Sequence, residues 1–148
     1  MEHKSMLDCG EADSEGNRPG ASILRLALAV SYMAGIYGLS SIPGDIDPEE
    51  ASIYGIIAWT PPALQNLLHI PLFGILAWLW YRTLRCWIES RGIVLCLSFL
   101  LAAGYGAIDE WHQMQVPGRY ASLTDMALNI LGVLLMLWLL SRRENRLG

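Results

Sequence analysis

Charge is scarce in this chain of 148 residues: Asp, Glu, Lys and Arg supply 16% of it, whereas hydrophobic residues supply 53%. Soluble globular domains usually carry about 25% charged residues. The mean hydropathy is +0.35. Between Ser22 and Leu140 the few charges are confined to short stretches, and long apolar blocks separate them. This distribution predicts a membrane protein rather than a soluble domain.

Cysteine is also sparse. The three cysteines, Cys9, Cys86 and Cys96, are neither even in number nor spaced like metal ligands. A disulfide framework is therefore not expected. Residues 1–21 lack the basic start and cleavable apolar stretch of a signal peptide, and their Glu, Asp, Ser, Gly and Asn content predicts a disordered cytoplasmic tail. No basic patch suits a nucleic-acid partner.

Catalytic signatures are missing as well. His-x-Glu, His-Glu-x-x-His and paired-cysteine patterns are absent, so neither a metal nor a cofactor is expected. A general acid/base pair such as His112 with Glu110 or Asp109 is chemically adequate, but no nucleophile elbow or phosphate loop accompanies it.

Four apolar blocks each have about the length that a helix needs to cross roughly 30 Å of hydrocarbon. A soluble bundle helix would keep a polar stripe, and the block from Gly92 to Gly106 has none. We therefore predict an all-α polytopic membrane protein with one domain over residues 22–141 and a basic tail over 142–148. The expected spans are Ile23–Leu39, Ala63–Tyr81, Gly92–Ile108 and Ala121–Leu140.

Basic residues predict the orientation, because loops rich in Lys and Arg stay on the cytoplasmic side. We predict that the protein spans the inner or plasma membrane and that both termini lie in the cytoplasm. In this orientation, only Arg119 of the ten basic residues lies outside. The long outer connection carries a stretch from Ile53 to Trp59 that could lie at the interface or pack over the bundle. The residues from Asp109 to Tyr120 are expected to form a tight outer turn or a shallow re-entrant piece.

Polar residues inside membrane segments are costly and usually face the bundle interior. At about 1.5 Å per residue, His69, Asp125 and Asn129 all fall roughly 6–12 Å below the outer surface. Asp125 and Asn129 are spaced i and i+4, and Gly132 one turn deeper would let a neighbouring helix approach. Asp109, His112 and Gln113 form a second polar face if the third helix continues through them.

Arg119 stands between these acidic stretches, so we expect it to pair with Asp109, Glu110 or Asp125. Two interpretations remain open: a structural ion network that fixes the outer turn, or an outward-facing site for a polar ligand. His69, which precedes Pro71, is also suited to a hydrogen bond across helices. Ser122 and Thr124 suit helix caps, with Asp125 in the first turn.

The pattern Asp109-Glu110-x-x-Gln113, then Pro117-Gly118-Arg119, then Asp125-x-x-x-Asn129-x-x-Gly132 resembles the signature of VanZ-like membrane proteins. Ser40-Ser41 with Pro43, and His69, agree with the family further upstream. The sequence departs from it at Gln65-Asn66, where relatives commonly have Asp-Lys, and at Gln115, where an aromatic residue is frequent.

The resemblance implies an integral membrane protein with an outer polar site, and its named member is associated with low-level resistance to teicoplanin. The ligand expected here is a cell-wall precursor, a membrane lipid or a lipoglycopeptide. The alternatives are an enzyme that modifies lipid headgroups through His112 or Glu110, and a transporter, which four short helices disfavour unless the protein oligomerises. The residues expected to line the site are His69, Asp109, Glu110, His112, Gln113, Arg119, Asp125 and Asn129.

Overall fold

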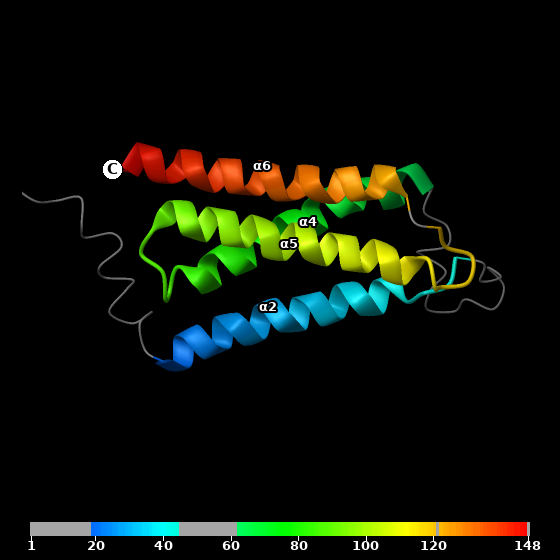
Figure 1. The fold of residues 1–148 in the computed structure, drawn as a ribbon, viewed down its shortest axis with the longest axis horizontal. Coiled ribbons are helices and arrows are strands. Elements are labelled where there is room, and N and C mark those ends of the chain that lie inside the picture. The colour runs from blue at the N-terminus through cyan, green and yellow to red at the C-terminus, as the bar shows by residue number, and fades with distance from the viewer. Residues whose placement is uncertain (1–18, 45–61, 121, 148) are drawn as a thin grey trace, which may run out of the picture.

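The computed structural model describes residues 19–44, 62–120 and 122–147, and within these ranges the regular structure is entirely α-helical. The four helices run side by side along the long axis (Figure 1). Each is long and apolar enough to cross a membrane, which confirms the predicted four-helix membrane fold. The helices are α2 (Pro19–Ser40), α4 (Pro62–Leu84), α5 (Arg91–Gln113) and α6 (Leu123–Leu147).

All four helices are longer than the apolar blocks that predicted them, and two of them extend well beyond the predicted end. Helix α5 continues beyond Ile108 to Gln113, because the polar residues of its last turn find partners inside the bundle. Helix α6 continues through residues 142–147, which we expected to form a tail. Hydropathy marks where the apolar segment ends, whereas the helix ends where its backbone loses hydrogen bonds. The predicted disordered tail and the stretch from Ile53 to Trp59 lie outside the described residues, except for residues 19–21, which are helical.

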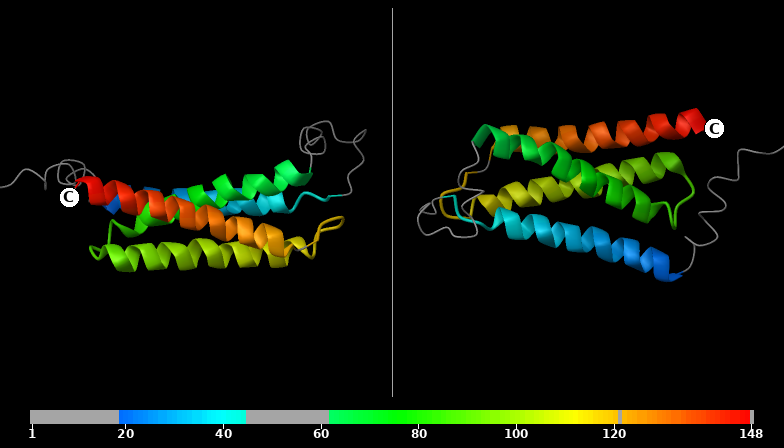
Figure 2. Two further views of the ribbon diagram at one scale, coloured as in Figure 1. Left: turned by 90° about the horizontal axis from the view of Figure 1, so that it is seen from above. Right: turned by 180° about the vertical axis from the view of Figure 1, so that it is seen from behind.

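Helix α4 contacts each of the other three described helices, whereas α2 and α6 do not touch. Two views from other sides show the same arrangement (Figure 2). The buried core includes Phe73 and Leu76 of α4 and Val133 of α6. Tyrosine hydroxyls tie α2 to the bundle, because Tyr32 donates to the Leu72 carbonyl at 3.1 Å and Tyr105 donates to a carbonyl of α2 at 2.6 Å.

The closest helix contact lies between α4 and α6. A Cβ atom added at Gly132 would stand 2.2 Å from the Ile70 carbonyl oxygen, and one at Gly74 would stand 3.3 Å from the Gly132 carbonyl oxygen. Two backbones can approach this closely only where a side chain is absent. The expectation that Gly132 admits a neighbouring helix is thus confirmed, and the neighbour is α4.

Large apolar side chains cover the outside of the bundle. Leu24, Leu100 and Leu139 are each more than half exposed. Exposure of this kind along all four helices would promote aggregation in water but suits contact with acyl chains. The chain is therefore a multi-pass membrane protein.

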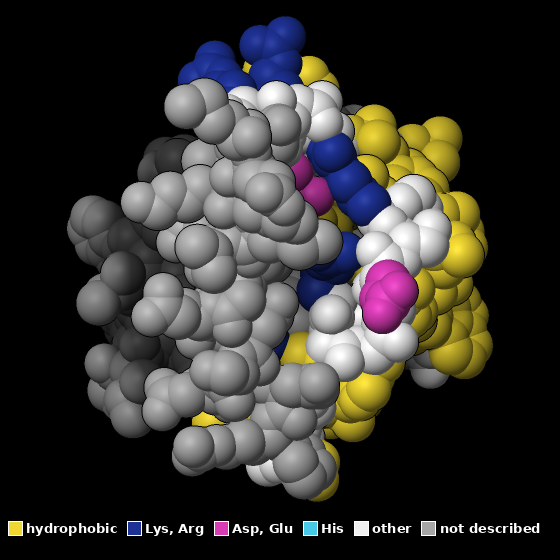
Figure 3. Space-filling view, turned by 90° about the vertical axis from the view of Figure 1, so that its left-hand side faces the viewer, with side chains coloured by type: hydrophobic (Ala, Val, Ile, Leu, Met, Phe, Trp, Pro, Cys, Tyr) yellow, Lys and Arg dark blue, Asp and Glu magenta, His cyan; other side chains and the backbone are white. Residues whose placement is uncertain are grey.

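The two ends of the bundle differ in charge. One end carries most of the described arginines, and the space-filling view of this end shows them gathered beside an apolar flank (Figure 3). Of the arginines that the structure describes, only Arg119 belongs to the opposite end. The positive-inside rule predicts that the arginine-rich end is cytoplasmic. The residues at that end are Arg25, Arg82, Arg85, Arg91, Arg142, Arg143 and Arg146.

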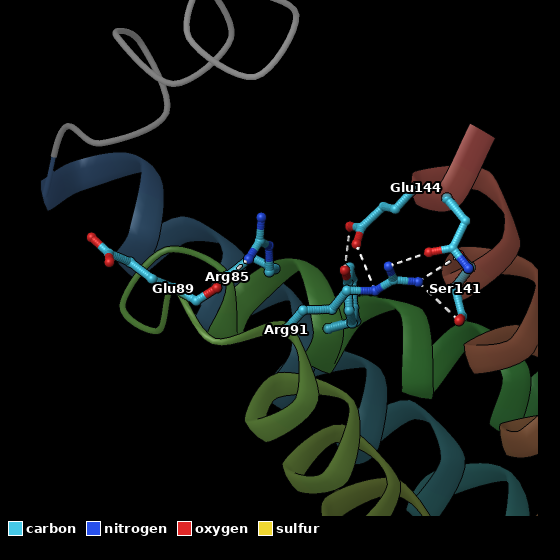
Figure 4. Close-up of polar contacts among 7 residues, drawn as sticks. Arg85, Glu89, Arg91, Ser141 and Glu144 are labelled. Atoms are coloured by element: carbon cyan, nitrogen blue, oxygen red, sulfur yellow. Dashed lines mark hydrogen bonds and ion pairs between the residues drawn. The ribbon is translucent and has the colours of Figure 1, made fainter. Parts of the chain in front are cut away.

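At the arginine-rich end, Arg91 joins the start of α5 to the last turns of α6 (Figure 4). Its Nε lies 3.1 Å from a Glu144 carboxylate oxygen, and its Nη2 donates to Ser141 Oγ at 2.9 Å. Nη1 donates to the Asn145 amide oxygen at 2.6 Å, and the Tyr81 hydroxyl donates to Glu144. Arg91–Glu144 is the only ion pair within the described ranges.

We expect Arg91→Gln to lower the free energy of unfolding by about 1 kcal/mol, because partly exposed ion pairs contribute between 0 and about 1 kcal/mol. Thermal unfolding in detergent should show a decrease of roughly 2–4 °C. Arg143→Gln on α6 is the control, since Arg143 is exposed. Equal unfolding temperatures for the two variants would contradict a structural role for the Arg91 contacts.

Candidate functional site

Five of the eight predicted site residues are buried together at the end of the bundle opposite the arginine-rich end. They come from the last turns of α5 and the first turns of α6, and none is more than 8% exposed. We call them the acidic cluster: Asp109, Glu110, Gln113, Asp125 and Asn129.

The α5 half of the cluster follows from helix periodicity. Asp109 and Gln113 are one turn apart, and Gln113 Nε2 donates to Asp109 Oδ2 at 3.0 Å. The predicted polar face is thus confirmed for these two residues. His112 belongs to a neighbouring face of α5 and contacts α2 instead.

Glu110 connects α5 to the start of α6. Its Oε2 accepts a hydrogen bond from the Ser122 backbone N–H at 3.0 Å. Ser122 Oγ in turn accepts from the backbone N–H groups of Thr124 at 3.2 Å and Asp125 at 3.4 Å. Ser122 is therefore the cap of α6, as predicted, whereas Thr124 lies inside the first turn.

This arrangement changes the role of Asp125. In a capping box, the acidic residue three positions after the cap accepts the backbone N–H of the cap residue. Here Glu110 accepts that N–H, so the Asp125 carboxylate is not used in the cap. Its Oδ1 is buried and has no hydrogen-bond partner.

Asn129 and His69 join α6 to α4. His69 Nδ1 and Asn129 Oδ1 are 2.7 Å apart, which confirms the expected bond across helices. The His69 ring also lies parallel to the Phe73 ring, with 6.2 Å between the ring centroids. Gly106 makes room for the amide, because a Cβ there would stand 3.3 Å from Asn129 Nδ2.

The hydrogen-bonding capacity of the acidic cluster is only partly used. Four of its buried side-chain atoms have no hydrogen-bond partner among the described residues: Asp109 Oδ1, Glu110 Oε1, Asp125 Oδ1 and Asn129 Nδ2. The ionisable neighbours of Glu110 are Asp125, His69 and Asp109, so these groups share one electrostatic environment. Buried polar atoms are normally paired, and such exceptions at one place suggest a missing partner.

Arg119 does not pair with the carboxylates, and our expectation of an ion pair there is wrong for the described residues. Its Nε donates to the Ile42 carbonyl oxygen at 2.9 Å. The cause is the turn before it, in which Gly118 has a φ of 70° and Gly44 N–H donates to the Pro117 carbonyl at 3.0 Å. These contacts bring Arg119 to the Ile42 carbonyl, which follows the end of α2.

His112 lies against the end of α2. Its ring stacks on Tyr37 with 4.2 Å between ring centroids, and its Nε2 lies 3.0 Å from Ser41 Oγ. Ser41 Oγ donates its only proton to the Tyr37 carbonyl at 2.7 Å, so the imidazole Nε2–H must be the donor to Ser41. Sequence reasoning missed this contact, although Ser41 stood out in the resemblance.

Within residues 19–44, 62–120 and 122–147, no three His, Cys, Asp or Glu side chains are grouped so that they could hold a metal ion. The cluster presents three buried carboxylate oxygens without a partner among these residues. It can accept several hydrogen bonds from a polar group and stabilise positive charge on it.

Comparison with known proteins gives one match. The family model described as VanZ/LLP1 matches residues 22–143, which include α4 and α5 in full, most of α2 and α6, and every residue of the acidic cluster. No curated protein matches the chain, and no solved structure does. Because the match extends over most of the chain and includes the residues that converge at one end of the bundle, this membrane protein belongs to the VanZ-like family.

Proposed function

We propose that the acidic cluster binds the polar headgroup of an envelope amphiphile at the outer leaflet of the cell membrane. The amphiphile would be a membrane lipid, a cell-wall precursor or a lipoglycopeptide antibiotic such as teicoplanin, with low-level resistance as one consequence. The observation that carries this proposal is the set of four buried polar atoms in the cluster for which the described part of the chain supplies no hydrogen-bond partner.

In a purely structural network, the buried polar atoms should find their hydrogen-bond partners within the network. Each buried polar atom without a partner costs about 1–3 kcal/mol, and charged groups cost more. Replacing a buried ionic network by apolar side chains is often neutral or stabilising. A cluster that leaves three carboxylate oxygens unpaired therefore destabilises the unliganded fold. A ligand that pairs with these atoms would offset the cost.

The unequal distribution of arginines between the two ends of the bundle supports the outer-leaflet location of the acidic cluster. The cluster lies opposite the arginine-rich end, which the positive-inside rule assigns to the cytoplasm. Headgroups of outer-leaflet lipids, cell-wall precursors and glycopeptide antibiotics are all found on that side of a bacterial membrane. The site and these ligands would meet without transport across the bilayer.

The contacts suggest different roles for the predicted site residues. Asp109, Glu110, Asp125 and Asn129 would touch the ligand, because each has an unpaired atom. Gln113 and His69 would orient Asp109 and Asn129 through their hydrogen bonds. Two further residues, Arg119 and His112, would hold the end of α2 against the site.

The catalytic alternative gains no support from the geometry. An acid/base role for His112 requires its imidazole to reach the polar group of the lipid headgroup. The ring instead stacks on Tyr37, and its Nε2–H donates to Ser41. One oxygen of the other candidate, Glu110, is occupied by the cap of α6. We therefore propose binding rather than catalysis.

The proposal can be tested in a teicoplanin-susceptible bacterium that expresses the protein. We expect wild-type protein to raise the minimum inhibitory concentration, and Asp109→Asn to return it to that of the empty vector. Membrane abundance of both proteins should be equal, because asparagine matches aspartate in size and can still accept from Gln113.

Ser98→Ala is the matched control, since Ser98 is fully buried on α5 and its Oγ also lacks a partner. It lies roughly 16 Å from Asp109 along the helix. This variant should keep the wild-type inhibitory concentration. Full resistance of Asp109→Asn would refute the binding role of Asp109, and its loss from the membrane would favour a structural role.

A further inference from the structure

The unpaired atoms of the acidic cluster differ in whether they donate or accept hydrogen bonds. Three are carboxylate oxygens, from Asp109, Glu110 and Asp125, and one is the amide nitrogen of Asn129. An ionised carboxylate only accepts hydrogen bonds, whereas the amide nitrogen only donates them. The missing partner must therefore supply several donors and at least one acceptor.

No Lys or Arg of the described residues pairs with the cluster, and its one basic neighbour, His69, is hydrogen-bonded to Asn129 rather than to a carboxylate. The only ion pair of the described residues, Arg91–Glu144, is at the other end of the bundle. The guanidinium nearest in sequence, Arg119, uses its Nε on a backbone carbonyl of the α2 end. Buried carboxylates are stable only when they are paired or coordinate a cation. The missing partner should thus carry positive charge.

Few chemical groups meet both requirements. A metal ion is disfavoured, because it needs its oxygen ligands at about 2.0–2.6 Å and no three potential ligands of the described ranges are grouped to hold one. An ammonium nitrogen donates over about 2.7–2.9 Å and so accepts more widely spaced oxygens. A trimethylammonium group has the charge but no N–H donor. A primary ammonium is compact and has three donors, which equals the number of unpaired carboxylate oxygens in the cluster.

We propose that the group received by the acidic cluster is a primary ammonium carried on the headgroup of an amphiphile. This inference rests on the proposed function and specifies its ligand. The ammonium donates to Asp109 Oδ1, Glu110 Oε1 and Asp125 Oδ1, and Asn129 Nδ2 donates to an oxygen of the same headgroup. An aminophospholipid such as phosphatidylethanolamine has this combination, with a phosphate oxygen near the amine.

The test uses the full chain in nanodiscs of phosphatidylcholine, whose headgroup has no N–H donor. Radiolabelled short-chain phosphatidylethanolamine is the probe, and its N-acetylated analogue and free ethanolamine compete with it. We expect the N-acetylated analogue to compete at least about tenfold less well, because it loses the charge and two of the three donors. Free ethanolamine should also compete weakly, because it lacks the apolar chains.

Asp109→Asn should bind the probe at least about tenfold less tightly and lose the preference over the N-acetylated analogue. Asp125→Asn repeats the test if Asp109→Asn is not recovered from membranes. Glu144→Gln is the control, since Glu144 is a carboxylate at the opposite end of the bundle. This variant should bind the probe like wild type.

The outcomes separate this inference from the proposed function. Equal competition by the N-acetylated analogue, with weaker binding of both lipids to Asp109→Asn, would refute the ammonium and support headgroup binding. Binding of both lipids that neither cluster variant changes would refute both proposals. Competition by free ethanolamine as strong as that by the lipid would support the ammonium but refute its attachment to an amphiphile.

Discussion

Asp125→Asn should weaken ligand binding at least about tenfold and yet leave the protein at least as resistant to thermal unfolding as wild type. The Asp125 carboxylate is 8% exposed and its Oδ1 has no partner. Asparagine has nearly the same shape but no charge. Its amide could also donate to the Glu110 carboxylate beside it.

Two effects on stability oppose each other in this variant. A carboxylate in the first turn of α6 interacts favourably with the helix dipole, and its loss costs about 0.3–1 kcal/mol. Burying an uncompensated charge costs several kcal/mol, and relief of that cost is larger. We therefore expect the free energy of unfolding to stay constant or rise by about 1 kcal/mol. Binding should weaken at least about tenfold, because a charge-assisted hydrogen bond is lost.

Thermal unfolding in detergent and binding in nanodiscs measure the two effects on the same preparation. Glu144→Gln provides the opposite case, because Glu144 pairs with Arg91 at the other end. That variant should lose a little stability and keep its binding. A decrease of several degrees in the unfolding temperature of Asp125→Asn would instead indicate a structural network.

Gly132→Ala should have the largest effect on folding. The added Cβ would stand 2.2 Å from the Ile70 carbonyl oxygen and 2.9 Å from two further backbone atoms of Ile70. Because these atoms belong to the backbone of α4, the two helices must separate. Overpacking costs about 1–3 kcal/mol, and a backbone clash belongs at the upper end of that range or above it. The gain in helix propensity from Gly to Ala, about 1 kcal/mol, is too small to compensate.

We expect Gly132→Ala to lower the unfolding temperature by roughly 10 °C and to reduce membrane abundance. The control is Gly104→Ala on α5, where an added Cβ meets nothing within 4 Å. This control should unfold at the wild-type temperature or slightly above it. Wild-type stability of Gly132→Ala would contradict the close contact between α4 and α6.

The separation of α4 and α6 should also affect the site. His69 and Asn129 join the same two helices at 2.7 Å, one turn from Gly132. A shift of α4 would lengthen this bond and leave both Asn129 polar groups unpaired. Any folded fraction of Gly132→Ala should therefore bind the lipid probe more weakly than Gly104→Ala does.

Much of the architecture follows from the sequence, because it depends on local properties. Apolar blocks of sufficient length predict the four helices. The positions of the basic residues in the sequence predict that one end of the bundle is rich in arginine and the other is not. The spacing of Asp109 and Gln113 predicts a shared face, and the pair is hydrogen-bonded. Ser122 is recognisable as a cap because capping involves only neighbouring residues.

Contacts between helices could not be read in the same way. The partner of a polar side chain depends on the rotation and separation of helices, and these are set by distant residues such as Gly132 and Ile70. The expectation for Arg119 was wrong for this reason, because the turn at Gly118 brings it to the Ile42 carbonyl. The contact between His112 and Ser41 joins residues 71 positions apart, which no local pattern specifies.

The sequence by itself thus determined a four-helix membrane bundle with acidic and amide side chains near one end, because length, hydropathy and helix period act within single segments. Only the tertiary structure decided which of those side chains are satisfied. Glu110 accepts the Ser122 N–H that Asp125 would otherwise accept, and so Asp125 Oδ1 is left without a partner. The physical reason is that hydrogen-bond donors are few in a bundle interior, and helix packing determines which acceptors reach them.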